Sequence, residues 1–216
     1  MTVADPSRVV ERGFDRLDDV YRDWVARMRD GPRAAFLARI LELIPAGADV
    51  LEIGCGPGTD VAALAEGRRY TGLDLSSVQL AHARRAVPAG RFLHADVFDV
   101  QLPPASFDAV VAFYVFGHVP AARTAELLER VATWLRPDGW FCATFAVSDD
   151  PGSVQPAWLG IADMYFSSLP PDRADALLRG TGFEVRSSQI IDEIEPGEGP
   201  ATFRWVVAQR TNGPSR

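Results

Sequence analysis

The chain contains no lysine, and its 22 basic residues are all arginine. Schiff-base catalysis and Walker-type phosphate loops both depend on a lysine, so both kinds of site are excluded. Cysteine and histidine are scarce: the chain has only Cys55 and Cys142, and only His82, His94 and His118. Their scattered positions argue against a disulfide framework and a metal centre, and we expect no metal site.

Long apolar runs and an excess of positive charge are also missing. No stretch is apolar enough to span a membrane, so we expect a soluble cytoplasmic protein without a membrane partner. The formal net charge is −7, whereas sequence-independent binding of nucleic acid requires a basic face, so no nucleic-acid partner is expected. A length of 216 residues with 47% hydrophobic content is sufficient for one well-buried domain.

What the chain does contain is a glycine-rich corner. A short apolar run at 49–53 is followed by Gly54, Gly56 and Gly58, and then by a segment, 61–65, that is expected to be helical. This order is typical of the nucleoside- or phosphate-binding corner of a doubly wound fold. Glycine is required where the chain turns with positive φ and a ligand approaches the backbone. A tight turn without a ligand is the alternative interpretation.

Acidic residues near this corner narrow the choice of ligand. Asp74 closes the next apolar run, at about the distance where such folds place a carboxylate on a ribose hydroxyl, and Asp96 closes the run after that. The dinucleotide fingerprint requires a glycine where this chain has Thr59. Glu52 precedes the loop, and a carboxylate there suits a cation better than a pyrophosphate.

These residues resemble the class I S-adenosylmethionine (SAM)-dependent methyltransferases, whose first motif is an acidic residue followed by Gly-x-Gly-x-Gly. The similarity extends from about Ala35 to the last predicted strand. It is carried by Glu52, Gly54, Gly56, Gly58, Asp74-Leu75-Ser76, Ala95-Asp96 and Phe107-Asp108-Ala109-Val110-Val111. The resemblance implies an α/β fold: a single Rossmann-like domain with a seven-stranded, mostly parallel sheet, helices on both faces and an antiparallel last strand.

Periodicity and turn residues place the other elements. Helices are expected at 33–44, 77–86, 121–135 and 172–180, and strands at 107–113, 140–147, 183–191 and 201–209. The connection at 148–169 is expected to be a lid or a binding loop, or else a helix packed on the sheet. We divide the chain into an N-terminal helical lid (1–30), a SAM-binding domain (31–210) and a flexible tail (211–216).

The resemblance also assigns residues to the cofactor, SAM. Asp74 would bind the ribose hydroxyls, and Asp96, with the amide of Val97, would bind adenine. Tyr21 is an aromatic candidate from the lid, and Gln79 stands where the family has an apolar residue. A capping role for Asp96 and an exposed position for Gln79 are the alternatives. The full expected set is Tyr21, Glu52, Gly54, Cys55, Gly56, Gly58, Asp74, Leu75, Gln79, Asp96, Val97 and Phe113.

The end of the fourth strand, 113–118, is expected to line the pocket because ligands bind at strand ends in open α/β sheets. His118 is the best available general base, since the ordinary pKa of histidine is near neutral, and Tyr114 is the second choice. A histidine that merely lines the wall is the alternative.

We therefore expect methyl transfer from SAM to an oxygen, nitrogen or carbon atom of a small molecule. Two alternatives are an NAD(P)-dependent oxidoreductase on a Rossmann-type fold and a SAM-binding protein without turnover. The base-modifying branches of the family that this chain resembles carry Asn-Pro-Pro-Tyr after the fourth strand. The chain lacks this sequence, so methylation of nucleic acid is disfavoured. A monomer or homodimer is expected.

Overall fold

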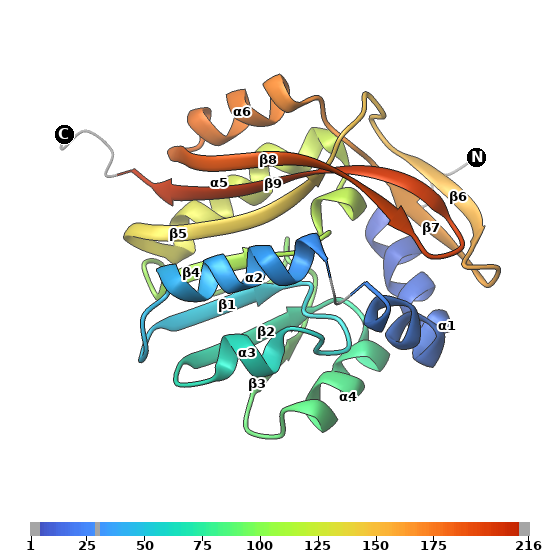
Figure 1. The fold of residues 1–216 in the computed structure, drawn as a ribbon, viewed down its shortest axis with the longest axis horizontal. Helices are drawn as coiled ribbons and strands as arrows, with labels where there is room; N and C mark the ends of the chain where they lie inside the picture. Colours follow the sequence, from blue (N-terminus) through green and yellow to red (C-terminus); the bar gives the residue numbers. More distant parts are fainter. Residues whose placement is uncertain (1–4, 29–30, 212–216) are drawn as a thin grey trace.

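A seven-stranded sheet forms the centre of the computed structural model, which describes residues 5–28 and 31–211 (Figure 1). The strand order is β3-β2-β1-β4-β5-β9-β8. Its strands are β1 (Asp49–Ile53), β2 (Arg69–Asp74), β3 (Arg91–His94), β4 (Phe107–Ala112), β5 (Leu135–Ala146), β8 (Phe183–Glu195) and β9 (Gly199–Arg210). Strands β1 to β5 pair in parallel, and β9 runs antiparallel to β5 and β8. The predicted fold is confirmed. Of the predicted tail, only Thr211 lies within the described residues.

Helices cover both faces of this sheet (Figure 1). On one face α2 (Pro32–Leu43) and α3 (Val61–Ala65) contribute to the same buried cluster as the sheet, and α4 (Ser77–Ala86) joins it through Leu80. On the other face α5 (Thr124–Trp134) and α6 (Pro171–Gly180) do the same. The central strand β4 is buried on both sides, which explains its nearly unbroken apolar sequence.

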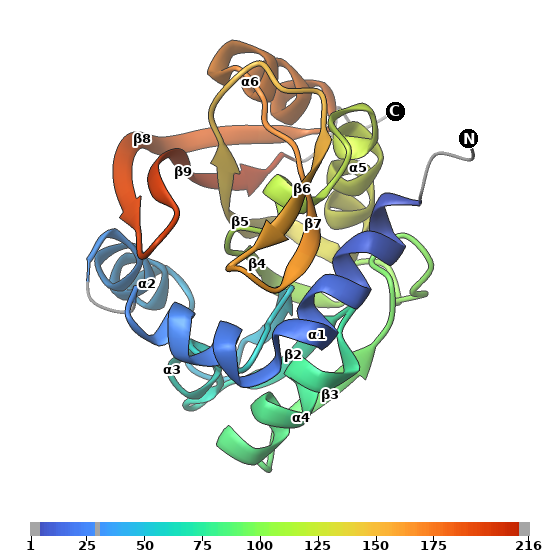
Figure 2. The same cartoon turned by 90° about the vertical axis from the view of Figure 1, so that its right-hand side faces the viewer.

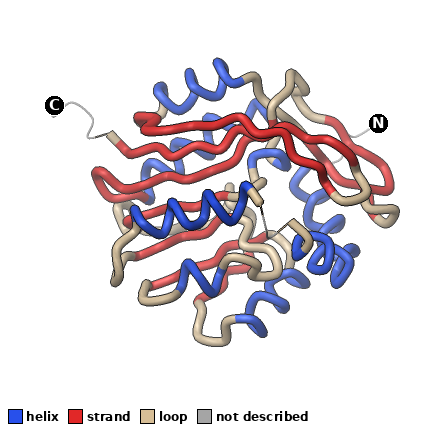
Figure 3. The backbone as a smooth tube through the Cα atoms, viewed as in Figure 1, coloured by secondary structure: helices blue, strands red, loops and turns tan. Residues whose placement is uncertain are grey.

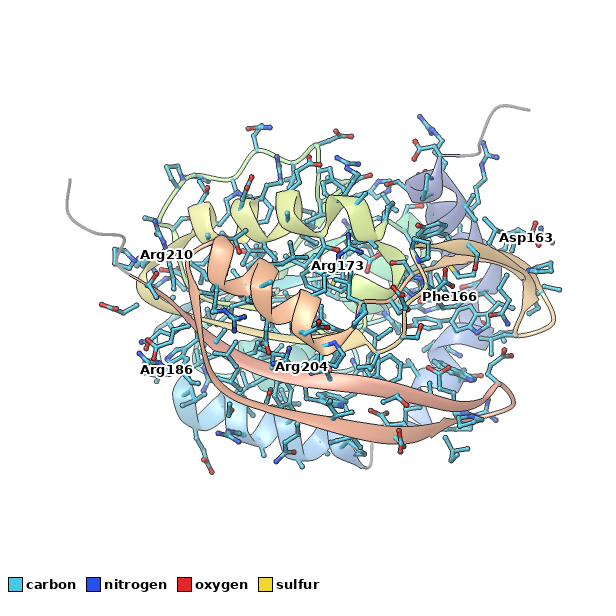
Figure 4. All side chains as sticks on the ribbon, turned by 90° about the horizontal axis from the view of Figure 1, so that it is seen from above. Asp163, Phe166, Arg173, Arg186, Arg204 and Arg210 are labelled. Atoms are coloured by element: carbon cyan, nitrogen blue, oxygen red, sulfur yellow. The ribbon has the colours of Figure 1, made fainter. Side chains whose placement is uncertain are left out.

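The last three strands are longer than predicted. Strand β5 begins at Leu135, before the predicted start of the strand at 140, and its register with β4 shifts over 136–139, so these residues form an irregularity within the strand. Strands β8 and β9 extend past the rest of the sheet (Figure 3). Arg204 on β9 lies beside α6 (Figure 4), and its guanidinium donates to Asp175 at 2.6 Å and to the Pro171 carbonyl at 3.0 Å.

Helix α1 (Pro6–Ala26) occupies the segment predicted to be a helical lid; residues 1–4 and 29–30 of that segment lie outside the described residues. The side chain of Asp5 caps its first turn, and the helix is interrupted at Asp18, whose φ is 40°. Nε2 of His82, on α4, lies 2.7 Å from an oxygen of Asp18 and 3.6 Å from one of Asp19. This contact fastens the interrupted part of α1 to α4.

The connection after β5 contains a β-hairpin, formed by β6 (Ser153–Trp158) and β7 (Ala162–Phe166). The alternative of a helix at 148–169 is therefore wrong. Leu159 and Gly160, both with positive φ, make the turn between the two strands. In Figure 2 the hairpin and α1 lie across the end of the molecule to which β1 and β4 point. No helix of the described residues is both long and apolar enough to cross a membrane.

Candidate functional site

A cleft of about 800 Å³, open solvent included, lies where the parallel strands end; we call it the inner cleft. The glycine loop after β1, the end of β2 and the segments after β3 and β4 form one side, and α1 forms the other. Most of the predicted SAM-binding residues line it: Tyr21, Gly54, Gly56, Asp74, Leu75, Gln79, Asp96, Val97 and Phe113. Residues far apart in the sequence are thus brought together at the ligand edge of the sheet.

The glycine loop is held by Asp74. One carboxylate oxygen accepts a hydrogen bond from the Gly56 amide at 2.7 Å, and the other accepts one from the Ser76 amide at 2.8 Å. Gly54 and Gly56 have φ values of 64° and 54°, which favour glycine. Each oxygen of Asp74 keeps a second lone pair, so the side chain can also accept hydrogen bonds from a ligand.

Three residues of the predicted set do not line the inner cleft. Glu52 is buried in β1 and accepts a hydrogen bond from the Tyr70 hydroxyl at 2.5 Å. Cys55 is buried in the core cluster on the α2 side of the sheet. At Gly58 an added Cβ would lie 3.0 Å from the Cα of Ala83, so this glycine allows the loop to approach α4. These three residues pack around the loop, and a contact of any of them with SAM stays a prediction.

Asp96 and Gln79 line the inner cleft and also make internal hydrogen bonds. An Asp96 oxygen accepts from the Phe98 amide at 2.8 Å, so this residue caps a turn as well. Gln79 is 1% exposed, and the alternative that it is an exposed helix residue is wrong. Its amide nitrogen donates to the carbonyls of Phe14 and Asp18 at the interruption of α1. Its oxygen, Oε1, has no hydrogen-bond partner among the described residues.

Sequence reasoning missed the contribution of Ser7, Val10 and Phe14 to the inner cleft. Val10, Phe14 and Tyr21 follow one another at helical spacing, so the sequence did contain the signal. The apolar face of α1 is shared between the protein core and the cleft, and periodicity alone cannot divide it between the two.

A second cavity, of about 1090 Å³ with open solvent, adjoins the first; we call it the outer chamber. Tyr21 and His118 line both cavities and form the boundary between them. Aromatic side chains supply much of its wall, together with three acids and one arginine: Tyr21, Trp24, Tyr114, Trp158, Phe166, Phe203, Asp150, Glu195, Glu198 and Arg33. The two cavities thus adjoin each other at Tyr21 and His118.

His118 is held at this boundary. Its Nδ1 lies 2.9 Å from the carbonyl oxygen of Tyr165, which can only accept, so Nδ1 carries the proton and Nε2 is left as the basic nitrogen. The imidazole ring contacts the rings of Phe14 and Phe166, at centroid distances of 5.2 and 5.0 Å. Burial lowers the pKa of His118 to about 4. The histidine is therefore neutral, and available as a weak base, at neutral pH.

Tyr114 follows β4 with a φ of 59° and lines only the outer chamber of the two. Its hydroxyl donates a hydrogen bond to Glu193 at 3.0 Å. Burial, followed by the charge of Glu193, raises the pKa of Tyr114 well above its ordinary value. The basic phenolate form of Tyr114 is thus scarcer at neutral pH than its residue type suggests.

The strand order, the glycine loop and the cleft at the strand ends define a Rossmann-like methyltransferase fold. A family model described as a methyltransferase domain matches residues 50–139. The chain is 35% identical over 167 residues to O-methyltransferase cnsE of Penicillium expansum, covering 72% of this chain and 60% of that protein. It is 37% identical over 182 residues to a fatty-acid O-methyltransferase of Mycolicibacterium smegmatis, covering 79% and 61%.

Among solved structures, the chain is similar to 1,6-didemethyltoxoflavin-N1-methyltransferase of Burkholderia thailandensis, crystallised with 1,6-didemethyltoxoflavin and S-adenosylhomocysteine. The TM-score is 0.72 at 26% identity, and the match covers 98% of this chain and 93% of that one. The chain spans half to three fifths of the length of several curated relatives. It belongs to the class I SAM-dependent methyltransferases.

Proposed function

We propose that the chain binds SAM in the inner cleft and transfers its methyl group to a small molecule held in the outer chamber. The observation that carries this proposal is the boundary formed by Tyr21 and His118, which joins a cleft built from the family motif to an aromatic chamber of sufficient size. SAM supplies an already activated methyl group. The protein's task is then to orient the acceptor and to exclude water.

The residues of the inner cleft fit SAM. Asp74 has free lone pairs for the ribose hydroxyls, and the glycine loop allows close approach of a ligand to its backbone. The unpaired Oε1 of Gln79 is a buried acceptor in a cleft, a position that calls for a donor from a ligand. Nucleoside hydroxyl and amino groups are donors of this kind.

His118 is proposed as the general base through Nε2, when the acceptor must lose a proton. No described residue donates a hydrogen bond to this nitrogen, and the ring borders both cavities. We also propose that α1 acts as the lid, because it contributes to the walls of both cavities and to their boundary at Tyr21. The division into a lid, 1–30, and a SAM-binding domain, 31–210, rests on this position.

Calorimetry tests the choice of cofactor. SAM and S-adenosylhomocysteine should bind with one site per chain, whereas NADH and NADPH should not bind. Binding of a nicotinamide nucleotide without SAM would overturn the proposal in favour of an oxidoreductase. SAM binding should be followed by a screen of phenols, carboxylates and amines for release of S-adenosylhomocysteine. SAM binding without turnover on any of them would favour a binding protein. Light scattering would establish whether the chain is a monomer or a homodimer, as expected.

A further inference from the structure

Acidic side chains outnumber basic ones among the described residues that line the outer chamber. Asp150, Glu195 and Glu198 line it, and Arg33 is the one arginine among its described lining residues. Arg33 is already paired: its Nη2 lies 2.6 Å from Asp60, and both side chains are buried. His118 is neutral near pH 7 because burial lowers its pKa to about 4. The charge of the arginine is therefore balanced internally, while the three acids face the chamber without a compensating cation.

Glu195 differs from the other two acids. Asp150 accepts hydrogen bonds from the Gly152 amide and the Ser153 hydroxyl. Glu198 accepts from the Leu159 amide and the Gln155 side chain. Among the described residues none donates a hydrogen bond to the side-chain carboxylate of Glu195, although this carboxylate is partly buried at the end of β8. A carboxylate that has lost water without gaining a donor is costly, and a ligand that donates to it offsets that cost.

Strands β8 and β9 form a second hairpin, and two acids of this hairpin influence the carboxylate of Glu195. Burial, followed by the charges of Glu193 and Glu198, raises the pKa of Glu195 to about 7. Across the chamber, Trp24 of α1 donates through Nε1 to the carbonyl of Pro196 at 2.8 Å. This bond fixes the hairpin end that carries Glu195 against the aromatic wall. The carboxylate and that wall can therefore contact the same ligand.

The wall itself suits a flat or cationic group. Tyr21 and Trp24 stack with a centroid distance of 5.9 Å, and Trp158 packs edge-on against Trp24 at 5.5 Å. Phe166 extends this cluster at 5.4 Å from Trp158. Aromatic faces attract organic cations and stack with planar rings, and they offer nothing that compensates an anion.

We propose that the acceptor has an apolar or aromatic body and a nitrogen group that donates hydrogen bonds, either an amine or a protonated nitrogen heterocycle, and that Glu195 binds this nitrogen. The proposal rests on the proposed function and specifies the substrate class of its acceptor site. A carboxylic acid of the same shape is a poor ligand, because its anion would be desolvated beside Glu195 without a free cation nearby. The nitrogen that Glu195 holds need not be the atom that is methylated.

Calorimetry with three ligands of one shape tests this inference: tryptamine, indole-3-propionate and 3-ethylindole. Each is titrated into protein saturated with S-adenosylhomocysteine, at about pH 8, where Glu195 is ionised. Tryptamine should bind at least about ten-fold more tightly than the other two, as expected for a charge-assisted hydrogen bond. Glu195→Gln should remove the preference. Glu184→Gln is the matched control, because Glu184 lies on the same strand but is exposed and pairs with Arg186.

The outcomes separate the two proposals. Failure of S-adenosylhomocysteine to bind the wild-type chain counts against the proposed function itself. If it binds but tryptamine shows no preference, or indole-3-propionate binds more tightly, the nitrogen proposal is overturned. The proposal also fails if Glu195→Gln keeps the wild-type preference while its melting temperature and cofactor affinity are normal. Glu195→Ala provides a second variant, and it should lose the same preference.

Discussion

We expect Asp74 to hold the glycine loop and to bind the cofactor, and one substitution tests both roles. Its carboxylate holds the glycine loop through the amides of Gly56 and Ser76, and we propose that it also binds the ribose of SAM. Asp74→Ala should therefore reduce SAM affinity by about 2 kcal/mol or more, measured by calorimetry. Because two backbone amides lose their acceptor, the melting temperature should fall as well. Asp99→Ala, at an exposed acid, is the control. Unchanged SAM affinity in Asp74→Ala would contradict the cofactor assignment.

The environment of His118 changes the pH dependence expected from its residue type. Burial lowers its pKa to about 4, so the neutral, basic form predominates at all higher pH values. In a plot of turnover against pH, the rise caused by deprotonation of His118 should lie near pH 4. His118 should cause no further change in turnover through neutral pH. With an identified acceptor, His118→Ala should reduce turnover by about 10²-fold or more while SAM affinity is retained. A rise near pH 6.5 that persists in the variant would assign the titration to another group.

At the level of the element, the glycine loop combines ligand contact with packing. An added Cβ at Gly56 would lie 3.8 Å from the Tyr21 ring in the inner cleft, whereas one at Gly58 would press on the Ala83 backbone at 3.0 Å. Gly56→Val should therefore abolish measurable SAM binding, with a stability loss caused mainly by its positive φ. Gly58→Val should mainly lower the melting temperature. Equal SAM affinity in wild type and Gly56→Val would show that the loop is structural only.

The sequence predicted those elements whose signals are local. The run that becomes β4 and the glycine loop each depend on a few adjacent residues, and both were placed correctly. For 148–169 the sequence predicted a lid or a binding loop, or else a helix, and it did not predict the β6–β7 hairpin. Trp158, Ile161, Ala162, Tyr165 and Phe166 recur at helical spacing, which gives no sign of paired strands. In the structure, pairing between the two strands overrides that periodicity. Local pattern cannot decide between a helix and strands in so short an apolar stretch.

The sequence could predict the residues of the candidate site that belong to a motif and lie at or just after the end of a strand. Asp74 and Asp96 do so, and both line the inner cleft. Glu52 belongs to the same motif, but its side chain is enclosed in the core beside Tyr70. The pKa values of His118 and Glu195 depend on burial by segments distant in the sequence. Such values follow from tertiary structure and cannot be derived from residue type.

For the whole molecule, Glu52 links stability to pH. Burial, followed by the charge of Asp60, raises the pKa of Glu52 well above its ordinary value of 4.5. The folded protein thus holds this proton at pH values where the unfolded chain has released it. Stability from this group is greatest below about pH 4.5 and falls as the pH rises. Glu52→Gln removes the penalty and keeps an acceptor for Tyr70, so it should gain at least about 1 kcal/mol relative to wild type between about pH 5 and pH 8.

Thermal denaturation at several pH values measures this difference. The melting temperatures of wild type and Glu52→Gln should diverge as the pH increases, with the variant higher at the alkaline end. Asp49 is a useful comparison, because Arg69 and Arg136 lower its pKa to about 2. Its contribution is present above about pH 4 and is lost only in strong acid. Parallel curves for wild type and Glu52→Gln would show that the buried carboxyl is not protonated in the folded state.

The two cavities have separate origins along the chain. Residues 50–139, which match the family model, contribute most of the inner cleft. Much of the outer chamber comes from segments outside that range, including Trp24, Asp150, Trp158, Glu195 and Phe203. Under the proposed function, mutation in the β6–β7 hairpin or the β8–β9 turn can therefore alter the choice of acceptor while the inner cleft, the proposed donor site, remains intact. In this way proteins that descend from one ancestral gene can acquire new substrates while the site for the methyl donor stays the same.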